Sequence, residues 1–339
     1  MKGRSMDIIE KGTGPIFSDP DPDKARAFFR QKSRIKKDKT MSLSKAVEKF
    51  VKDGDYLGIG GFGANRTPVA ACHEILRQKK KNLGFAGHTA THDMQILSAG
   101  KAYNRIDVAY VVGLEARGLS NCSRKYLESG EVEVSEWTNY ALSVRLQAAA
   151  MGVPFLPMRS MLGTQTFEKS GAVAAKCPFT DKKMALVPAL SPDVSFVHVH
   201  EADMYGNARF EGIAVADLEL ANASKHLVIT CERLVSHEVI ARDPHRTQIP
   251  YFIVDAVCEV PYGAFPGTMP NEYFSDEDHL REWLTKEKDP EAFETFLQDN
   301  IYGCGNFQEY IDRNGGIGRM QELRRKEFMI NGGDTNDNV

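Results

Sequence analysis

The segment DGDYLGIGGFGANRTP, from Asp53 to Pro68, places glycines at positions 58, 60, 61 and 63, where an apolar strand gives way to a helix. When a strand ends in glycines and a helix follows, backbone N–H groups point into the crevice at the carboxyl end of the sheet. Dinucleotide binding, a phosphate loop and an acyl or oxyanion cradle all use this arrangement. A glycine turn that only lets the helix pack tightly has the same pattern.

Two of these chemistries fit the sequence poorly. The glycine spacing only loosely resembles G-x-G-x-x-G, and no acidic residue ends a second strand near residues 83–87. The segment GANRTP lacks the Gly-Lys-Ser/Thr of a phosphate loop. An oxyanion cradle and a packing turn therefore stay open.

The histidines and cysteines are weaker candidates. His88 and His92 have the i, i+4 spacing of a metal-binding helix face, but a third ligand is missing, which favours a substrate contact over a metal. We interpret His198 and His200 as buried strand residues and Cys72 as a core residue. The 6 cysteines contain no C-x-x-C pair, which favours reduced thiols in a cytoplasmic protein.

Three glutamates stand beside glycines or strand ends. Glu128 and Glu211 are interpreted as structural or solvent-facing residues. Glu115 follows the carboxyl end of a strand, where α/β enzymes keep site residues, but a surface ion pair with Arg117 or Arg124 explains it as well.

The organisation of the chain indicates an α/β protein. Of its 339 residues, 42% are hydrophobic and 26% charged, and the net charge of −3 gives no sign of a nucleic-acid binder. No apolar run is long enough to span a bilayer, and the N-terminus lacks the apolar core of a signal peptide. Both observations favour the cytoplasm.

Strand-like and helical segments alternate from residue 41 onward, beginning with a helix over 42–53 capped by Ser42 or Ser44. We predict a single three-layer α/β/α domain over residues 41–330 with a mostly parallel central sheet. Residues 276–328 are expected to form helices on the outside. Residues 1–40 are expected to be an extension that is loose or packs on a neighbour, and residues 331–339 a disordered tail.

Several ordered blocks resemble family I coenzyme A transferases, and specifically the A (alpha) subunits of the glutaconate type. Gly60-Gly61-Phe62 and Pro68 match the first signature of that family, whereas Arg66 stands where many members carry glycine and Gly58 replaces an apolar residue. The similarity extends over about residues 41–310 and includes LSNCSRKYLESG, QAAAMGVPFLP, ITCERLVSHEVIARDP and VDAVCEVPYGAFP.

The resemblance implies half of an active site. Two-chain members keep the nucleophilic glutamate in a Ser-Glu-Asn-Gly type motif of the B (beta) subunit, and this chain has no such motif. It would supply the acyl cradle of a hetero-oligomer, such as a dimer of AB pairs or a larger assembly, that moves coenzyme A between an acyl-CoA and a (di)carboxylic acid. The thioester is the substrate, and no permanently bound cofactor or metal is expected. The expected substrate contacts are Gly60, Gly61, Phe62, Gly63, Asn65, Arg66, Gly87, His88 and Asn121, with Arg66 gripping a substrate carboxylate or a CoA phosphate.

Two alternatives remain. In the first, the chain belongs to a superfamily CoA-thioester hydrolase, ring-cleaving enzyme or decarboxylase that lacks the transferase glutamate, with Glu115 as a candidate base. In the second, it is a sensor built on the broader fold of sugar-phosphate isomerases. A sensor would need a DNA-reading helix pair before the domain, and residues 1–40 are too short to provide one.

Overall fold

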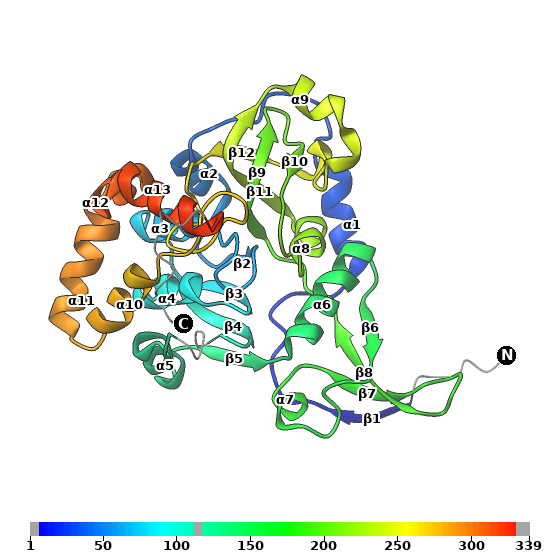
Figure 1. Cartoon of the computed structure of the whole chain (residues 1–339). Helices are drawn as coiled ribbons and strands as arrows, with labels where there is room; N and C mark the ends of the chain where they lie inside the picture. The colour runs from blue at the N-terminus through cyan, green and yellow to red at the C-terminus, as the bar shows by residue number, and fades with distance from the viewer. Residues whose placement is uncertain (1–6, 112–116, 330–339) are drawn as a thin grey trace.

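The computed structural model describes residues 7–111 and 117–329, which form two sheets (Figure 1). The large sheet has 8 strands, and its neighbouring strands pair in parallel in the order β12-β11-β9-β2-β3-β4-β5, while β10 pairs with β9 in the antiparallel sense. The strands are β2 (Tyr56–Ile59), β3 (Leu83–His88), β4 (Tyr103–Ala109), β5 (Glu133–Glu136), β9 (Val194–Asp203), β10 (Ala208–Arg209), β11 (His226–Val235) and β12 (Ala256–Glu259).

Helices cover both faces of the large sheet, because consecutive strand residues are buried on opposite sides. Leu57 and Phe85 belong to the core with α2–α4 and the C-terminal helices, whereas their neighbours Tyr56 and Ala86 belong to the core with α6 and α8. The expected three-layer fold with a mostly parallel sheet is confirmed. The helices are α2 (Leu43–Phe50), α3 (Val69–Arg77), α4 (His92–Ala99), α5 (Asn121–Glu128), α6 (Asn139–Met151), α8 (Asp217–Ala223), α9 (His237–Arg242), α10 (Glu277–Lys286), α11 (Pro290–Leu297), α12 (Phe307–Arg313) and α13 (Gly316–Glu327).

The C-terminal helices do more than wrap the outside. Trp283 of α10 and Phe293 and Phe296 of α11 are buried in the same core as the central strands, so this region completes one face of the domain. The first predicted helix is confirmed as α2, and the hydroxyl of Ser42 caps it by accepting from the N–H of Lys45. No helix in the described ranges is long and apolar enough to cross a membrane.

The second sheet is small and antiparallel, and the sequence did not predict it. Its order is β1-β7-β8-β6, from β1 (Ile8–Lys11), β6 (Phe155–Met158), β7 (Val173–Lys176) and β8 (Lys183–Pro188), with the short helix α7 (Gln165–Glu168) between β6 and β7. The segment KMALVPAL has the pattern of a buried strand and forms β8. A short turn joins it to β7, so the two strands pair in the antiparallel sense, whereas a parallel pair would need a longer crossover connection.

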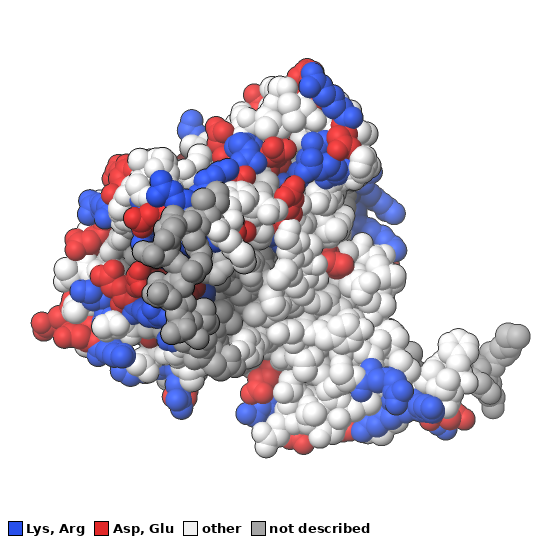
Figure 2. All heavy atoms as spheres, viewed as in Figure 1, with Lys and Arg blue, Asp and Glu red and all other residues white. Residues whose placement is uncertain are grey.

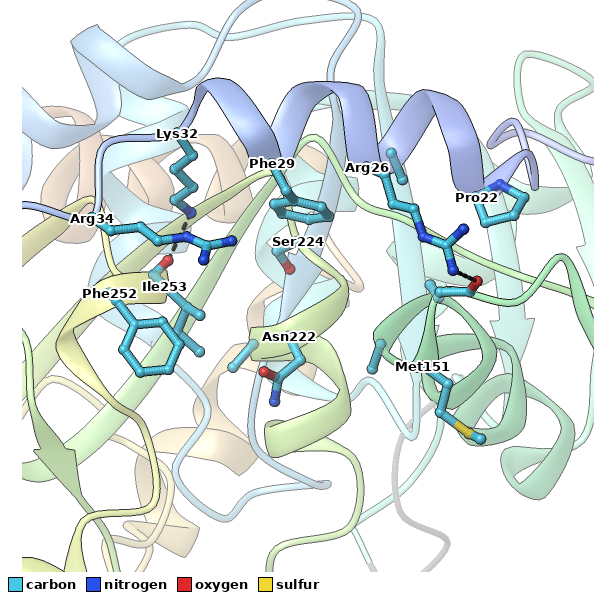
Figure 3. Close-up of a pocket in the computed structure, with 15 residues that line it drawn as sticks. Pro22, Arg26, Phe29, Lys32, Arg34, Met151, Asn222, Ser224, Phe252 and Ile253 are labelled. Atoms are coloured by element: carbon cyan, nitrogen blue, oxygen red, sulfur yellow. Dashed lines mark hydrogen bonds between the residues drawn. The ribbon is translucent and has the colours of Figure 1, made fainter.

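The expectation that residues 1–40 are loose is wrong for residues 7–40, which pack on their own chain, and packing on a neighbour stays a prediction. Strand β1 pairs with β7, and α1 (Pro22–Gln31) lies along the end of α6 and α8 beside a cavity of about 330 Å³ (Figure 3). Lys32 forms an ion pair of 2.7 Å with Asp255, and Arg26 donates to the carbonyl of Gly152 at 3.1 Å. The basic residues of this segment therefore fasten it to its own chain.

Candidate functional site

The glycine loop after β2 folds into a tight turn. The backbones of Phe62 and Asn65 exchange two hydrogen bonds of 3.0 Å each around Gly63 and Ala64, and Gly61 and Gly63 have φ angles of 86° and 61°. Both values lie in the left-handed region that glycine adopts at low cost. Arg66 also has a positive φ of 54°, which agrees with the glycine that many family members carry there.

Most N–H groups of this loop have partners within the chain. Gly60 donates to the carbonyl of Phe196 at 2.8 Å, Gly61 to Oδ1 of Asp217 at 2.8 Å, and Gly63 to the carbonyl of Thr89 at 3.1 Å. The N–H groups of Phe62, Asn65 and Arg66 also donate to carbonyls. Within residues 60–66, Ala64 is the residue whose N–H has no hydrogen-bond partner in the described part of the chain. The expected cradle of several free N–H groups is therefore wrong, and Ala64 alone is left to contact a ligand.

The glycines themselves make room for the protein's own atoms. A Cβ at Gly58 would lie 2.3 Å from Oγ of Ser195, and a Cβ at Gly61 would lie 2.5 Å from the carbonyl oxygen of Asn65. At Gly87 it would lie 2.7 Å from a methyl group of Val111. Gly63 differs, because the nearest atom to its Cβ would be 3.9 Å away. The packing explanation therefore holds for these glycines except Gly63.

The guanidinium of Arg66 is buried in an ion pair inside the chain. Its side chain is 0% exposed, and Nη2 lies 2.8 Å from Oδ2 of Asp217, whose side chain is also 0% exposed. The same guanidinium donates to the carbonyl of Ile213 and stacks 4.3 Å from the ring centre of Phe210. Nη1 and Nη2 of Arg66 are directed at these groups, while the buried Nε has no partner in the described part of the chain. Because the side chain is 0% exposed, Arg66 does not reach a substrate carboxylate or a CoA phosphate in this structure, so the expected grip is corrected to a structural role.

A cavity of about 410 Å³ opens beside the loop, at the carboxyl ends of β2 and β3. The loop and the strand ends form its floor, and α6 and the start of α8 form its walls. Binding sites of open α/β sheets lie at this edge. Phe62 and His88 are the predicted residues that it brings together, with 5.7 Å between their ring centres. The lining residues are Phe62, His88, Asn139, Tyr140, Ser143, Val144, Gln147, Val215 and Glu219.

Hydrogen bonds fix the polar groups of this cavity. Nε2 of His88 lies 3.1 Å from the carbonyl of Asn139 and 2.8 Å from Oγ of Ser143. Since a carbonyl only accepts, Nε2 carries the hydrogen, and burial lowers the pKa of His88 and favours its neutral form. The hydroxyl of Thr89 donates to Oδ1 of Asn139 at 2.9 Å. This bond leaves the NH₂ of Asn139 without a partner among the described residues, as a donor at the cavity wall.

Sequence reasoning missed the wall that α6 contributes. Asn139, Ser143 and Gln147 follow one another at i, i+4 and i+8, so they form one polar stripe on a helix whose other residues are mostly apolar. That spacing was the available signal. It went unnoticed because the helix begins 51 residues after His88, which it contacts.

Several predicted residues lie elsewhere. Glu115 falls outside the described residues, and its two suggested partners are engaged: Arg117 pairs with Glu277 at 2.5 Å and Arg124 with Glu128 at 2.9 Å. Glu128 is exposed, as predicted. The other predicted site residue, Asn121, begins α5, where its N–H donates to the carboxylate of Glu287 on α10 at 2.6 Å. None of these contacts brings Asn121 to the glycine loop.

The other histidines singled out in the sequence are buried and hydrogen-bonded. His198 contacts Thr230 at 2.8 Å and Glu232 at 2.7 Å, and His200 contacts the carbonyl of Pro270 at 2.6 Å, which confirms both as structural. His92 is buried against the ring of Trp283, so it does not share a metal-binding face with the half-buried His88. The last two predictions, on Cys72 and Glu211, are also confirmed: Cys72 is buried, and Glu211 forms an exposed ion pair with Arg246.

The comparison with known proteins establishes the family. The model of the coenzyme A transferase family matches residues 40–260, and the chain belongs to this family. A relative in Archaeoglobus fulgidus, described as an uncharacterized protein, is 45% identical over 96% of this chain and 73% of its own length. The A chain of glutaconate CoA-transferase from Acidaminococcus fermentans is 30% identical over 82% of this chain and 92% of its own.

Solved structures agree with the sequence comparison. The crystal structure of that glutaconate CoA-transferase superposes with a TM-score of 0.80 at 30% identity, over 84% of this chain and 95% of the other. A variant of the decarboxylase AibA/AibB superposes with a TM-score of 0.70 at 29% identity, over 78% of this chain and 100% of the other. The cholesterol ring-cleaving hydrolase IpdA subunit of Rhodococcus jostii is 30% identical over 79% of this chain and 93% of its own. Relatives with different chemistries therefore share this fold.

Proposed function

We propose that this chain is the alpha subunit of a two-subunit CoA-transferase that moves coenzyme A between an acyl-CoA and a carboxylic acid. The observation that carries the proposal is the cavity at the carboxyl edge of the sheet. Its wall offers a neutral hydrogen-bond donor, the NH₂ of Asn139. The N–H of Ala64, which follows the lining residue Phe62 by two positions in the glycine loop, is a second donor that has no partner among the described residues. Donors of this kind stabilise the negative charge that develops on a thioester carbonyl oxygen.

The rim of the cavity is suited to a protein partner. Tyr140, Ile213 and Val215 have exposed fractions of 63%, 51% and 37%, which is unusual for large apolar residues beside a polar cavity. Figure 2 shows a broad surface without charged side chains across the middle of the molecule. A beta subunit seated on this rim would close the cavity and introduce its glutamate.

In this proposal the partner performs the covalent chemistry. Its carboxylate attacks the thioester carbonyl, the C–S bond breaks, and an acyl anhydride and CoA thiolate form. The thiolate then attacks the enzyme's own carboxyl carbon, which releases the acid and leaves CoA on the partner. A second acid reverses both steps. The donors of Asn139 and Ala64 hold the carbonyl oxygen, and the neutral His88 keeps Asn139 and Ser143 in place.

A second candidate function follows from Glu219, a carboxylate that lines the same cavity. It is half-buried and forms no hydrogen bond or ion pair with the described residues. If the partner lacks the nucleophilic glutamate, Glu219 or Glu115 would act as a base that activates water on a CoA thioester. The ring-cleaving hydrolase and the decarboxylase among the relatives support the view that reactions other than transfer occur on this fold.

The experiment is to assay the chain alone and with its co-purifying partner, using acyl-CoA donors and acetate as acceptor. We expect no turnover without the partner, and hydroxylamine or borohydride trapping that labels the partner and not this chain. Asn139→Ala should lower kcat of the complex by roughly 10²-fold, the effect of one oxyanion donor. Asn222→Ala, an exposed asparagine on α8, serves as the control. Robust transfer by the isolated chain, or hydrolysis without transfer, would reject the proposal.

A further inference from the structure

The charges around the cavity indicate which acyl groups it accepts, an inference that rests on the proposed function. The lining residues include no lysine or arginine. Two arginines lie nearby, Arg66 after the loop and Arg145 on α6. Each has a side chain that is 0% exposed and pairs with an equally buried carboxylate, Arg66 with Asp217 and Arg145 with Asp107.

Both arginines direct their charge at a carboxylate inside the fold. Nε of Arg66 and Nη2 of Arg145 have no partner among the described residues, but both side chains are 0% exposed. Arg66 donates to both oxygens of Asp217, at 3.2 Å and 2.8 Å, and Arg145 donates to Asp107 at 2.6 Å and to the carbonyl of Pro188 at 3.1 Å. A buried ion pair whose groups are hydrogen-bonded to each other is held tightly, because separating them leaves a charge without solvent. Each ion pair therefore contributes no net charge to the cavity.

Glu219 is then the one formal charge that the described lining residues contribute. His88 adds none, because burial lowers its pKa and favours its neutral form. The carboxylate of Glu219 is half-buried and has no partner among the described residues, so no cation in the described part of this chain offsets it. Like charges brought together in a partly dehydrated site repel strongly, and this repulsion is a common source of specificity.

We infer that the acyl group accepted by this cavity ends in a neutral group, and that Glu219 disfavours thioesters of dicarboxylic acids. The remaining lining side chains agree with such a substrate. Phe62, Tyr140 and Val144 provide apolar surface, and Ser143 and Gln147 provide uncharged groups that suit a keto, hydroxyl or amide end. A dicarboxylate would instead require a cationic partner at its far end.

The test compares two thioesters that differ in charge and hardly in shape: succinyl-CoA and 4-oxopentanoyl-CoA, in which a methyl ketone replaces the far carboxylate. For the complex of both subunits we expect kcat/KM to favour 4-oxopentanoyl-CoA by roughly tenfold or more. Glu219→Gln should shift the ratio toward succinyl-CoA by about tenfold. Glu128→Gln, which removes an exposed carboxylate on α5, should leave the ratio unchanged.

Three kinetic outcomes and one assembly outcome would overturn the inference. The first is equal or better turnover of succinyl-CoA by the native complex. The second is a kcat/KM ratio of the two thioesters that Glu219→Gln leaves unchanged. The third is a loss of kcat in Glu219→Gln that is the same for both thioesters. The last result would identify Glu219 as a base. Weaker assembly of the Glu219→Gln complex, measured by sedimentation, would also overturn the inference and assign the carboxylate to the interface with the partner. If the native complex consumed no CoA thioester at all, the proposed function itself would fail, which is a distinguishable result.

Discussion

Replacing Arg66 should destabilise the fold and leave substrate affinity nearly unchanged. In Arg66→Met the carboxylate of Asp217 keeps the N–H of Gly61 as a donor but loses both guanidinium bonds, at 3.2 Å and 2.8 Å, in a site with no access to water. Breaking a buried ion pair by removing one partner costs about 3–5 kcal/mol. For a chain of 339 residues we expect the melting temperature to fall by about 4–7 °C.

The assay is thermal and urea unfolding of the purified chain, followed by circular dichroism, together with KM of the complex for its acid. Arg246→Met is the matched control, because that arginine pairs with Glu211 on the surface, where such pairs contribute about 0–1 kcal/mol. In the double variant Arg66→Met/Asp217→Asn the loss should be smaller than the sum of the two single losses. An unchanged melting temperature together with a KM raised ten- to a hundredfold would refute this reasoning and restore Arg66 as the substrate grip.

Three further predictions address other parts of the fold. Gly61→Ala should lower the free energy of unfolding by more than about 2 kcal/mol, because its Cβ would lie too close to the carbonyl oxygen of Asn65. Gly63→Asn should lower it by about 1 kcal/mol or less, because asparagine tolerates a positive φ and the space there is open. Equal losses for the two variants in urea unfolding would contradict this prediction. Burial raises the pKa of Asp93 from 3.8 to about 6, so the protonated form is favoured in the folded state. The stability of the native chain relative to Asp93→Asn should therefore increase by about 2.4 kcal/mol as the pH falls from about 7.5 to about 4, and a constant difference across that range would contradict it. Lys32→Met should weaken the attachment of the N-terminal segment to the domain, because the ion pair with Asp255 is lost. Limited proteolysis should then cleave near α1 before the rest of the chain unfolds. An unchanged cleavage pattern would show that the ion pair does not hold this segment in place.

Local patterns predicted the main elements well. The helix capped by Ser42 and the strand that ends in the glycine loop follow from periodicity and from start and stop residues that are close in sequence. The next strand was predicted in the same way to end at Gly87, and it ends one residue later, at His88. The same local logic placed the predicted site at the carboxyl edge of the sheet, where Phe62 and His88 do line a cavity.

Contacts between distant residues could not be predicted in this way. Asp217 lies 151 residues after Arg66, and its single carboxylate accounts for both the buried guanidinium and the Gly61 N–H. From the sequence alone, which does not show that Asp217 lies next to Arg66, a charged residue beside a glycine turn is expected to bind substrate. The pairing of β1 with β7 also joins segments more than 160 residues apart, so an N-terminal segment without a recognisable partner was expected to be loose.

The internally bonded glycine loop has a consequence for how this family diversifies. Its shape is set by Phe196, Asp217, Thr89 and Thr268 of the same chain, so it is complete before any partner arrives. In the proposed complex, a beta subunit that carries the reactive group could change that group without a compensating change in the loop. Selection on the reaction would act mainly on the partner, and selection on the acyl group mainly on the cavity wall of α6 and α8. One inherited scaffold could in this way serve transferases, hydrolases and decarboxylases in turn.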